Sequence, residues 1–232
     1  MPTKTLSSES GELARLRLMQ LTSPALPVGG FTYSQGIEWA VEAGWIRDVG
    51  SLRDWLSGLI DDGLAGLELP LLVRLYRACE AGEPAQVGHW GRQLLASRET
   101  RELRQEELNR ARALISLLRD LGIGRVTEWA DELVHCQAAP FAVAAVEWRI
   151  TLEDCLLGYA WSWLENQVAA AIKLVPLGQT DGQRVQLQLA ESLPGACARA
   201  LKIDDDAIGS SAPALAIASA RHETQYTRLF RS

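Results

Sequence analysis

The chain has 232 residues, 47% of them hydrophobic and 22% charged, so it can bury a core of ordinary globular composition. Its formal net charge of −6 argues against a nucleic acid or an anionic membrane as a partner, because such partners usually select a basic face. No stretch approaches the roughly 18 uninterrupted apolar residues of a membrane helix, and the polar N-terminal segment lacks the apolar part of a signal peptide.

The four cysteines are scattered along the chain without a CxxC pair, which indicates neither a zinc site nor a disulfide framework. We interpret most of them as small core residues in a reducing compartment. The expectation is therefore a cytoplasmic protein that binds neither nucleic acid nor membrane.

Helical periodicity predicts a first helix with Leu13, Leu16 and Met19 on one face. It ends at Ser23-Pro24, because the residue before a proline is pushed out of the helical region. A second helix is predicted from about Tyr33 to Trp45.

A third helix begins after a cap at Asp48 or Ser51. One of its faces is apolar and carries Leu52, Trp55, Leu56, Leu59 and Ile60. Further helices are predicted near 69–80, 84–96, 97–121, 125–136 and 141–149.

The segment Cys155–Ile172 is apolar almost all round, which is typical of a buried helix at the centre of a bundle. Glu165, Asn166 and Gln167 interrupt it. They lie either at an exposed edge, in internal hydrogen bonds, or in a polar spot at a dimer interface. Arg184-Val-Gln-Leu-Gln-Leu fits a short strand or a helix, and the helical context favours a helix.

No repeat and no long linker divides the chain, so the sequence predicts one all-α domain of about ten helices over residues 1–232, arranged around a central apolar helix at about 155–175. The N-terminus, about 1–11, is expected to be flexible. Gly209-Ser-Ser and Pro213 separate a last short helix that begins near Ala214.

A turn between the first two helices contains Pro27, Gly29, Gly30 and then Gly36. It is not a phosphate-binding loop, since the GxxxxGK[ST] spacing is missing, and Ser34 is not in a GxSxG nucleophile elbow. The glycines permit positive φ and close approach of another backbone. That approach is either close packing inside the bundle or a surface for a partner.

Metal and acid–base groups are sparse. The three histidines, His89, His135 and His222, are far apart in sequence. His135 and Cys136 are a weak metal pair, because adjacent helical residues point about 100° apart. Asp61-Asp62 and Asp204-Asp205-Asp206 are interpreted as solvated turns and caps. We expect no catalytic residue, no bound cofactor and no resident metal.

The ordered blocks of the chain resemble the UreF family of urease accessory proteins over nearly the whole length. The blocks are Leu16-Arg-Leu-Met-Gln-Leu, Leu26-Pro-Val-Gly-Gly-Phe, Ser34-Gln-Gly-Ile-Glu-Trp, Leu69-Pro-Leu, Ser97-Arg-Glu-Thr-Arg-Glu-Leu-Arg, Lys173-Leu-Val-Pro-Leu-Gly-Gln and Ala220-Arg-His-Glu-Thr-Gln-Tyr-Thr-Arg-Leu-Phe-Arg-Ser232. Segments 122–150 and 181–208 contribute no pattern.

The resemblance implies an all-helical, non-enzymatic and commonly dimeric protein. It implies a complex with UreD (also called UreH) and the GTPase UreG on the urease apoprotein, where GTP-dependent nickel delivery is coupled to assembly of the nickel centre. On this interpretation the glycine turn shapes a protein-binding surface. A nickel carrier that uses His135, Cys136 and His222, or a helical enzyme that binds a small ligand, are the alternatives.

The expected partner-binding residues fall in two groups. Gly29, Gly30, Tyr33, Ser34, Glu38 and Lys173 belong to the turn and to the end of the apolar helix, and Arg221, His222, Tyr226 and Arg228 belong to a C-terminal docking tail at about 221–232. Glu38 and Lys173 are expected to serve function rather than folding. The tail is expected to be poorly ordered and to dock UreD, unless its apolar residues fold back onto the bundle.

Overall fold

The computed structural model describes residues 5–209 and 212–232, and it confirms an all-α protein. Of the segment 1–11 that was expected to be flexible, residues 1–4 lie outside the described residues and the remainder begins the first helix. Ser210 and Ser211 of the expected Gly209-Ser-Ser turn also lie outside them.

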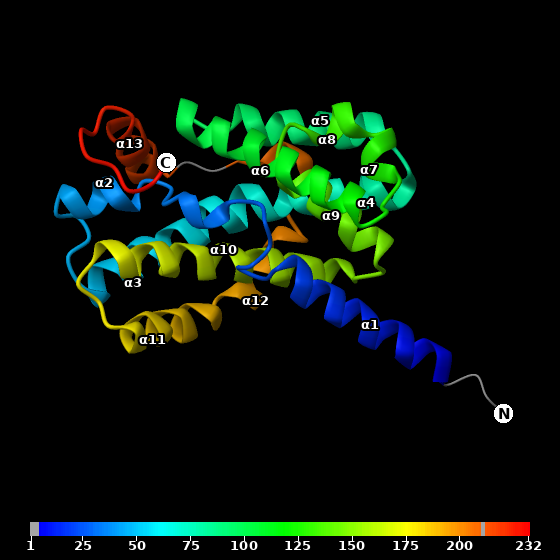
Figure 1. Cartoon of the computed structure of the whole chain (residues 1–232), viewed down its shortest axis with the longest axis horizontal. Helices are drawn as coiled ribbons and strands as arrows, with labels where there is room; N and C mark the ends of the chain where they lie inside the picture. The colour runs from blue at the N-terminus through cyan, green and yellow to red at the C-terminus, as the bar shows by residue number, and fades with distance from the viewer. Residues whose placement is uncertain (1–4, 210–211) are drawn as a thin grey trace.

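Thirteen α-helices are present in the described ranges (Figure 1). They are α1 (Thr5–Leu21), α2 (Ile37–Glu42), α3 (Val49–Leu59), α4 (Leu69–Ala81), α5 (Pro84–Ala96), α6 (Arg101–Asp120), α7 (Arg125–Glu128), α8 (Ala130–Leu133), α9 (Ala138–Glu147), α10 (Leu152–Leu174), α11 (Gln179–Ala190), α12 (Leu193–Ala200) and α13 (Pro213–His222). The other helical elements are the 3₁₀ turns η1 (Gly30–Thr32) and η3 (Asp205–Ala207) and the π-helical segment η2 (Ile60–Glu68). None of the described helices is both long enough and apolar enough to cross a bilayer.

The central position of α10 is confirmed. It packs against α1, α2, α3, α4, α9, α11 and α12, and its side chains from Cys155 to Ala171 form much of the core. The helix is nevertheless less enclosed than the sequence predicts, because Leu157 and Trp161 are exposed. The hexamer at 184–189 lies in α11 and is helical, as expected.

The second helix is shorter than predicted. It begins at Ile37, because Gln35 and Gly36 both have positive φ, 49° and 81°, which a helix cannot continue through. The following helix starts as predicted, with Asp48 as its N-cap in a reciprocal capping box with Ser51.

The pair Asp61-Asp62, interpreted as a solvated turn, lies instead within η2, so that α3, η2 and α4 form one helical rod from Val49 to Ala81. Asp61 forms a surface ion pair with Arg199 of α12 at 2.6 Å. Within the rod, Glu68 is buried and binds Arg98, which also binds Glu107 of α6. Burial would lower the pKa of the Arg98 guanidinium, but the two carboxylates raise it, so the group stays charged.

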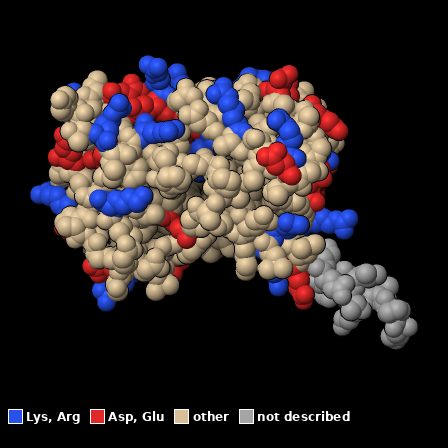
Figure 2. All heavy atoms as spheres, in the orientation of Figure 1, with Lys and Arg blue, Asp and Glu red and all other residues tan. Residues whose placement is uncertain are grey.

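The two ends of the described chain lie at opposite ends of the molecule. The helix α1 projects from the body beside the start of α10, whereas α13 and the segment after it lie against α2 and α6 (Figure 1). The face seen in Figure 2 has basic and acidic side chains interspersed rather than gathered by sign.

Candidate partner-binding site at the C-terminal tail

The glycine turn is the foundation of this region. Gly29 has a φ of 72°, which glycine adopts without strain, and it precedes η1. Gly36 has a φ of 81°, and a Cβ atom there would lie 3.1 Å from the Cβ of Ala218 in α13. The close backbone approach expected at Gly36 therefore occurs, and it is packing within the molecule.

The segment 223–232, which we call the tail, is not loose as expected but folds back on this turn. The carbonyl oxygen of Ser232 accepts hydrogen bonds from the backbone N–H of Ser34 at 2.8 Å and from its hydroxyl at 2.6 Å. The N–H of Arg231 donates to the carbonyl of Thr32 at 2.9 Å. Phe230 is buried, so the alternative in which the apolar tail residues fold back is correct for this side chain.

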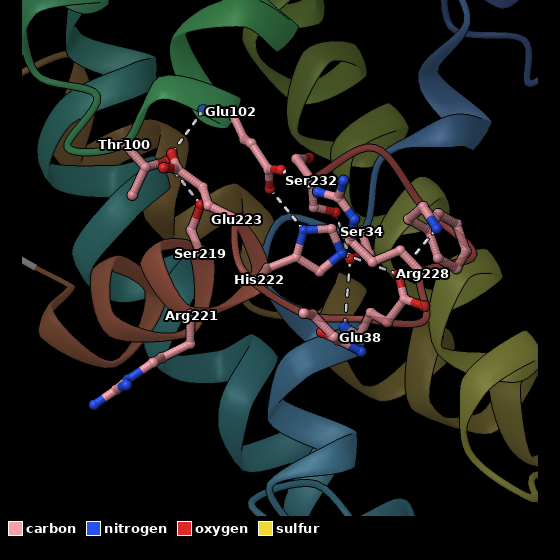
Figure 3. A network of polar contacts seen from close by, with 12 residues as sticks. Ser34, Glu38, Thr100, Glu102, Ser219, Arg221, His222, Glu223, Arg228 and Ser232 are labelled. Carbon is pink, nitrogen blue, oxygen red and sulfur yellow. Dashed lines mark hydrogen bonds and ion pairs between the residues drawn. The ribbon is translucent and has the colours of Figure 1, made fainter.

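Glu38 holds the tail from below (Figure 3). Its side chain is only 8% exposed, and its two oxygens accept the N–H groups of Leu229 and Phe230 at 2.6 and 2.9 Å. The same carboxylate lies 3.0 Å from Nε2 of His222. The expectation that Glu38 does not serve folding is therefore wrong, since its carboxylate forms hydrogen bonds that hold the tail on the core.

His222 joins the tail to α6. It is fully buried, and its Nδ1 atom lies 2.6 Å from a carboxylate oxygen of Glu102. The other oxygen of Glu102 accepts from Arg228 at 2.7 Å. Glu223 accepts the free backbone N–H groups of Arg101 and Glu102 at the start of α6, where the helix dipole favours an anion.

A second polar layer lies beneath the tail. The side chain of Gln35 accepts from Trp163 and Gln167 of α10 at 2.9 and 3.0 Å and donates to Glu106 at 2.9 Å. Glu106 also pairs with Arg110, one helical turn further along α6, at 2.8 Å. Burial and the nearby Glu107 raise the pKa of the Glu106 carboxyl, against the opposing effect of Arg110.

This layer also decides between the interpretations of the polar residues of α10. Gln167 is fully buried and bonded to Gln35, and Asn166 donates to the carbonyl of Tyr33 at 3.4 Å. Both are internal hydrogen-bonding groups. Glu165 is only partly exposed, and this partial burial raises the pKa of its carboxyl group.

Two surfaces meet at the tail. A charged cleft of about 370 Å³ is lined by Tyr33, Arg101, Glu102, Gln105, Asn109, Glu223, Arg228 and Arg231. An aromatic cleft of about 560 Å³ is lined by Trp39, Glu42, Trp45, Ile217, Arg221, Thr224, Gln225 and Tyr226. Tyr226 is fully exposed and Leu229 is 65% exposed, so these two tail residues do not fold back. Arg221 points away from the buried network (Figure 3).

The structure brings most of the predicted residues together. Tyr33, Ser34, Glu38, His222 and Arg228 share one region, and Gly30 and Lys173 line a neighbouring cleft of about 370 Å³ between the turn and α10. Lys173 is exposed, and its Nζ atom lies 5.6 Å from the centre of the Phe230 ring, a cation–π distance.

Sequence reasoning missed the residues that connect the region, namely Gln35, Glu102, Glu106 and Ser232. Gln35, Glu102 and Ser232 belong to sequence blocks that carry the resemblance, and this was the available signal. Glu106 lies outside those blocks.

The residues of the nickel-carrier alternative do not form a metal site in the described part of the chain. Cys136 is fully buried, and burial together with the charge of Glu107 raises the pKa of its thiol, which disfavours the thiolate that a metal needs. His222 is engaged by two carboxylates. Among the described residues, no group of three or more His, Cys, Asp or Glu side chains is arranged to hold a metal ion.

Comparison with known proteins identifies the family to which the chain is similar. The family model described as UreF matches residues 46–190. A protein of Pseudomonas putida named urease accessory protein UreF is 52% identical over 223 residues, 96% of this chain and 100% of that protein. Proteins with the same name from Alcanivorax borkumensis and Alkalilimnicola ehrlichii are 51% and 46% identical, over 94% and 95% of this chain and 98% and 96% of theirs. This similarity extends along nearly the whole chain, and the chain therefore belongs to the UreF family of urease accessory proteins.

Proposed function

We propose that this protein is a non-catalytic scaffold for urease maturation in the cytoplasm. It forms a complex with UreD (also called UreH) and the GTPase UreG on the urease apoprotein, and it couples GTP-dependent nickel delivery to assembly of the metal centre. The observation that carries the proposal is the tail. It is fixed to the core on one side and keeps Tyr226 and Leu229 in solvent on the other.

The aromatic cleft is the docking surface for UreD in this proposal. Tyr226 is fully exposed, and Trp45 and Ile217 are 41% and 49% exposed, which places three large apolar side chains around one hollow. Arg221 lies at its edge. Aromatic and arginine side chains are enriched where interfaces concentrate their binding energy, which supports a protein partner here.

The charged cleft is the contact surface for UreG. Arg228 and Arg231 line it together with Tyr33, whose hydroxyl accepts a hydrogen bond from Asn109 at 3.3 Å. Glu38 acts on this surface indirectly, by holding the tail that carries the arginines. Lys173 contributes from the neighbouring cleft.

The homodimer forms through α1 and α10. Leu13, Leu16 and Met19 of the projecting helix α1 are 54–67% exposed, and Met19 lines a groove together with Leu157 and Trp161 of α10. The groove between these helices and α12 has a volume of about 440 Å³. An apolar stripe of this kind on a projecting helix is typical of an interaction face.

Capture of UreD and UreG tests the scaffold. The protein is expected to co-purify with tagged UreD, and UreG is expected to join only that complex. Tyr226→Ala should weaken capture of UreD by a factor of roughly 30, which corresponds to about 2 kcal/mol for a central anchor. Its thermal stability should not change, since the side chain is in solvent.

The matched control is Leu187→Ala, which removes another large exposed apolar side chain, on α11 and outside the aromatic cleft. It should leave capture of UreD unchanged. If both variants behave like the unmodified protein, the aromatic cleft is not the docking surface. If no complex forms at all, the scaffold proposal is refuted.

The dimer is tested separately by light scattering on a sizing column. Met19→Asp should convert the dimer to a monomer, because it places a charge in the proposed apolar interface, whereas Leu187→Asp should not. A monomeric unmodified protein would contradict this part of the proposal.

A further inference from the structure

Five side-chain amides line the cleft beside the glycine turn. This cleft, which we call the amide cleft, has a volume of about 370 Å³ and lies between the end of α1, the turn, α10 and α11. The amides belong to Gln137, Asn166, Gln179, Gln183 and Gln186. A carboxamide has two N–H donors and an acceptor oxygen, so it can pair with both the N–H and the C=O groups of a peptide backbone.

Gln137 is enclosed, yet its amide is not used within the molecule. The residue is only 7% exposed, and its backbone N–H donates to Glu107 at 3.0 Å. Its carboxamide forms no hydrogen bond with any of the described residues, and it lines the amide cleft. Buried side-chain polar groups are nearly always hydrogen-bonded, so this amide is available to a ligand that enters the cleft.

The charged side chains of the cleft favour an acidic ligand. They are Arg110, Lys173 and Glu165, two cations and one carboxylate in a chain whose formal net charge is −6. Arg110 donates to Glu106 through Nη1 at 2.8 Å, and its guanidinium has further N–H donors. A carboxylate is the group that such a planar set of donors binds most specifically.

Gly30 leaves two of these polar groups uncovered. Its φ is not positive, so the backbone does not require a glycine at this position. A Cβ atom there would lie 3.5 Å from Oδ1 of Asn166 and 3.6 Å from Nη2 of Arg110, which are ordinary contact distances. The missing side chain therefore keeps an acceptor and a charged donor open to the cleft.

The cleft is also long and apolar along one wall. Leu26, Val28 and Phe31 of the turn line it, and Phe31 is 63% exposed. On α10 the lining extends from Ser162 to Lys173, which at a rise of 1.5 Å per residue is about 16 Å. An extended chain advances about 3.3 Å per residue, so about five residues fit along it.

We propose that the amide cleft binds an extended peptide segment of a partner protein, with one acidic side chain against Arg110 and an apolar side chain against Phe31. The amides pair with the backbone of this segment, and Gln137 is the innermost of these contacts. A small carboxylate would use the charge but only part of the length and few of the amides. The inference requires neither UreD nor UreG as the partner, so it is tested on the isolated chain.

An array of capped pentapeptides, probed with the purified full chain, tests the ligand class. The central position is fixed as Glu, Asp, Gln or Lys, and the flanking positions are equal mixtures of residues. The Glu and Asp pools should retain roughly tenfold more protein than the Lys pool, because of the two cations in the cleft. Equal retention by all pools, or by none, would overturn the proposal.

Two substitutions test the location, with a selected acidic pentapeptide followed by fluorescence polarisation. Gln137→Leu keeps the backbone bond to Glu107 but removes the amide, and it should weaken binding by roughly tenfold. Gly30→Ala covers Asn166 and Arg110 with a methyl group and should weaken binding by a similar factor. The control is Gly195→Ala in α12, where nothing lies within 4 Å, and it should bind like the unmodified protein.

Gly30→Ala keeps the test decisive if Gln137→Leu fails to fold, because its Cβ atom fits at ordinary contact distances. Peptide binding that a folded Gly30→Ala variant leaves intact would show that the peptide lies elsewhere and would refute the site. Competition by the single capped residue N-acetylglutamate methylamide, at the same concentration as the pentapeptide, would show that an extended segment is not the ligand.

Discussion

Removal of the Glu38 carboxylate should destabilise the whole protein. This side chain accepts two backbone N–H groups of the tail and contacts Nε2 of His222, and it is 8% exposed. In Glu38→Ala all three donors lose their acceptor. A buried donor without a partner costs about 1–3 kcal/mol, and the tail can reduce the penalty by detaching into water.

We therefore expect Glu38→Ala to lower the free energy of unfolding by about 3 kcal/mol, which for a chain of this size lowers the Tm by roughly 6–12 °C. Urea denaturation followed by circular dichroism measures the first quantity, and a thermal scan measures the second. Hydrogen exchange should show that the loss is concentrated in the tail and in the glycine turn.

Glu42→Ala is the matched control. Glu42 lies one turn further along α2, is exposed, and bonds only to the side chain of Gln225. Its removal should change the stability by no more than about 0.5 kcal/mol, as for an ordinary surface substitution. If Glu38→Ala were as stable as Glu42→Ala, the tail would not be attached through Glu38 and the reasoning would be refuted.

The remaining predictions concern packing and alkaline pH. Gly36→Ala should lower the free energy of unfolding in urea by about 1–3 kcal/mol, because alanine must adopt a φ of 81° and its Cβ would lie 3.1 Å from the Cβ of Ala218. The control is Gly58→Ala in α3, where nothing lies within 4 Å, and it should be neutral or stabilising. Equal losses of stability in both variants would contradict this prediction. Burial raises the pKa of the Cys79 thiol to about 12 and that of Cys197 to about 11 from a model-peptide value of 9.0, so the stability these thiols contribute is complete below pH 9 and is lost as the pH rises towards those values. Iodoacetamide should accordingly label them at pH 8 no faster than the protein unfolds, and rapid labelling of the folded protein would show that they are not enclosed.

Local rules were sufficient for the helices and for the centre of the bundle. A helix that is apolar around its whole axis has to be enclosed by other helices, and this rule identified α10 as the central helix. The N-cap residue Asp48 located the start of α3. The same rules extended α2 back to Tyr33, because neither the hydrophobic period nor helix propensity indicates that Gln35 takes a positive φ. That strain is maintained by long-range bonds of its side chain to Trp163 and Gln167.

The sequence pointed to many of the residues of the candidate site, but it did not show how they are arranged in space. Periodicity places Glu38 on a face of α2 and does not say which distant segment will cover that face. Here the segment is 191 and 192 residues away, at Leu229 and Phe230. Polar and apolar residues are mixed in the sequence of the tail, because one side of the tail faces the core and the other faces solvent. Phe230 is turned inward, and Tyr226 is turned to solvent.

The contact between Ser34 and Ser232 spans 198 residues, so it orders the events of biosynthesis. The glycine turn leaves the ribosome early, whereas its covering segment is translated after almost all the rest of the bundle. At typical rates of 5–20 residues per second, the interval is roughly 10–40 s. Until that segment is made, the Ser34 backbone, the Glu38 carboxylate and the first N–H groups of α6 lack the partners that they have in the folded protein. The glycine turn can therefore complete its hydrogen bonds only after the helices between it and the tail have been synthesised.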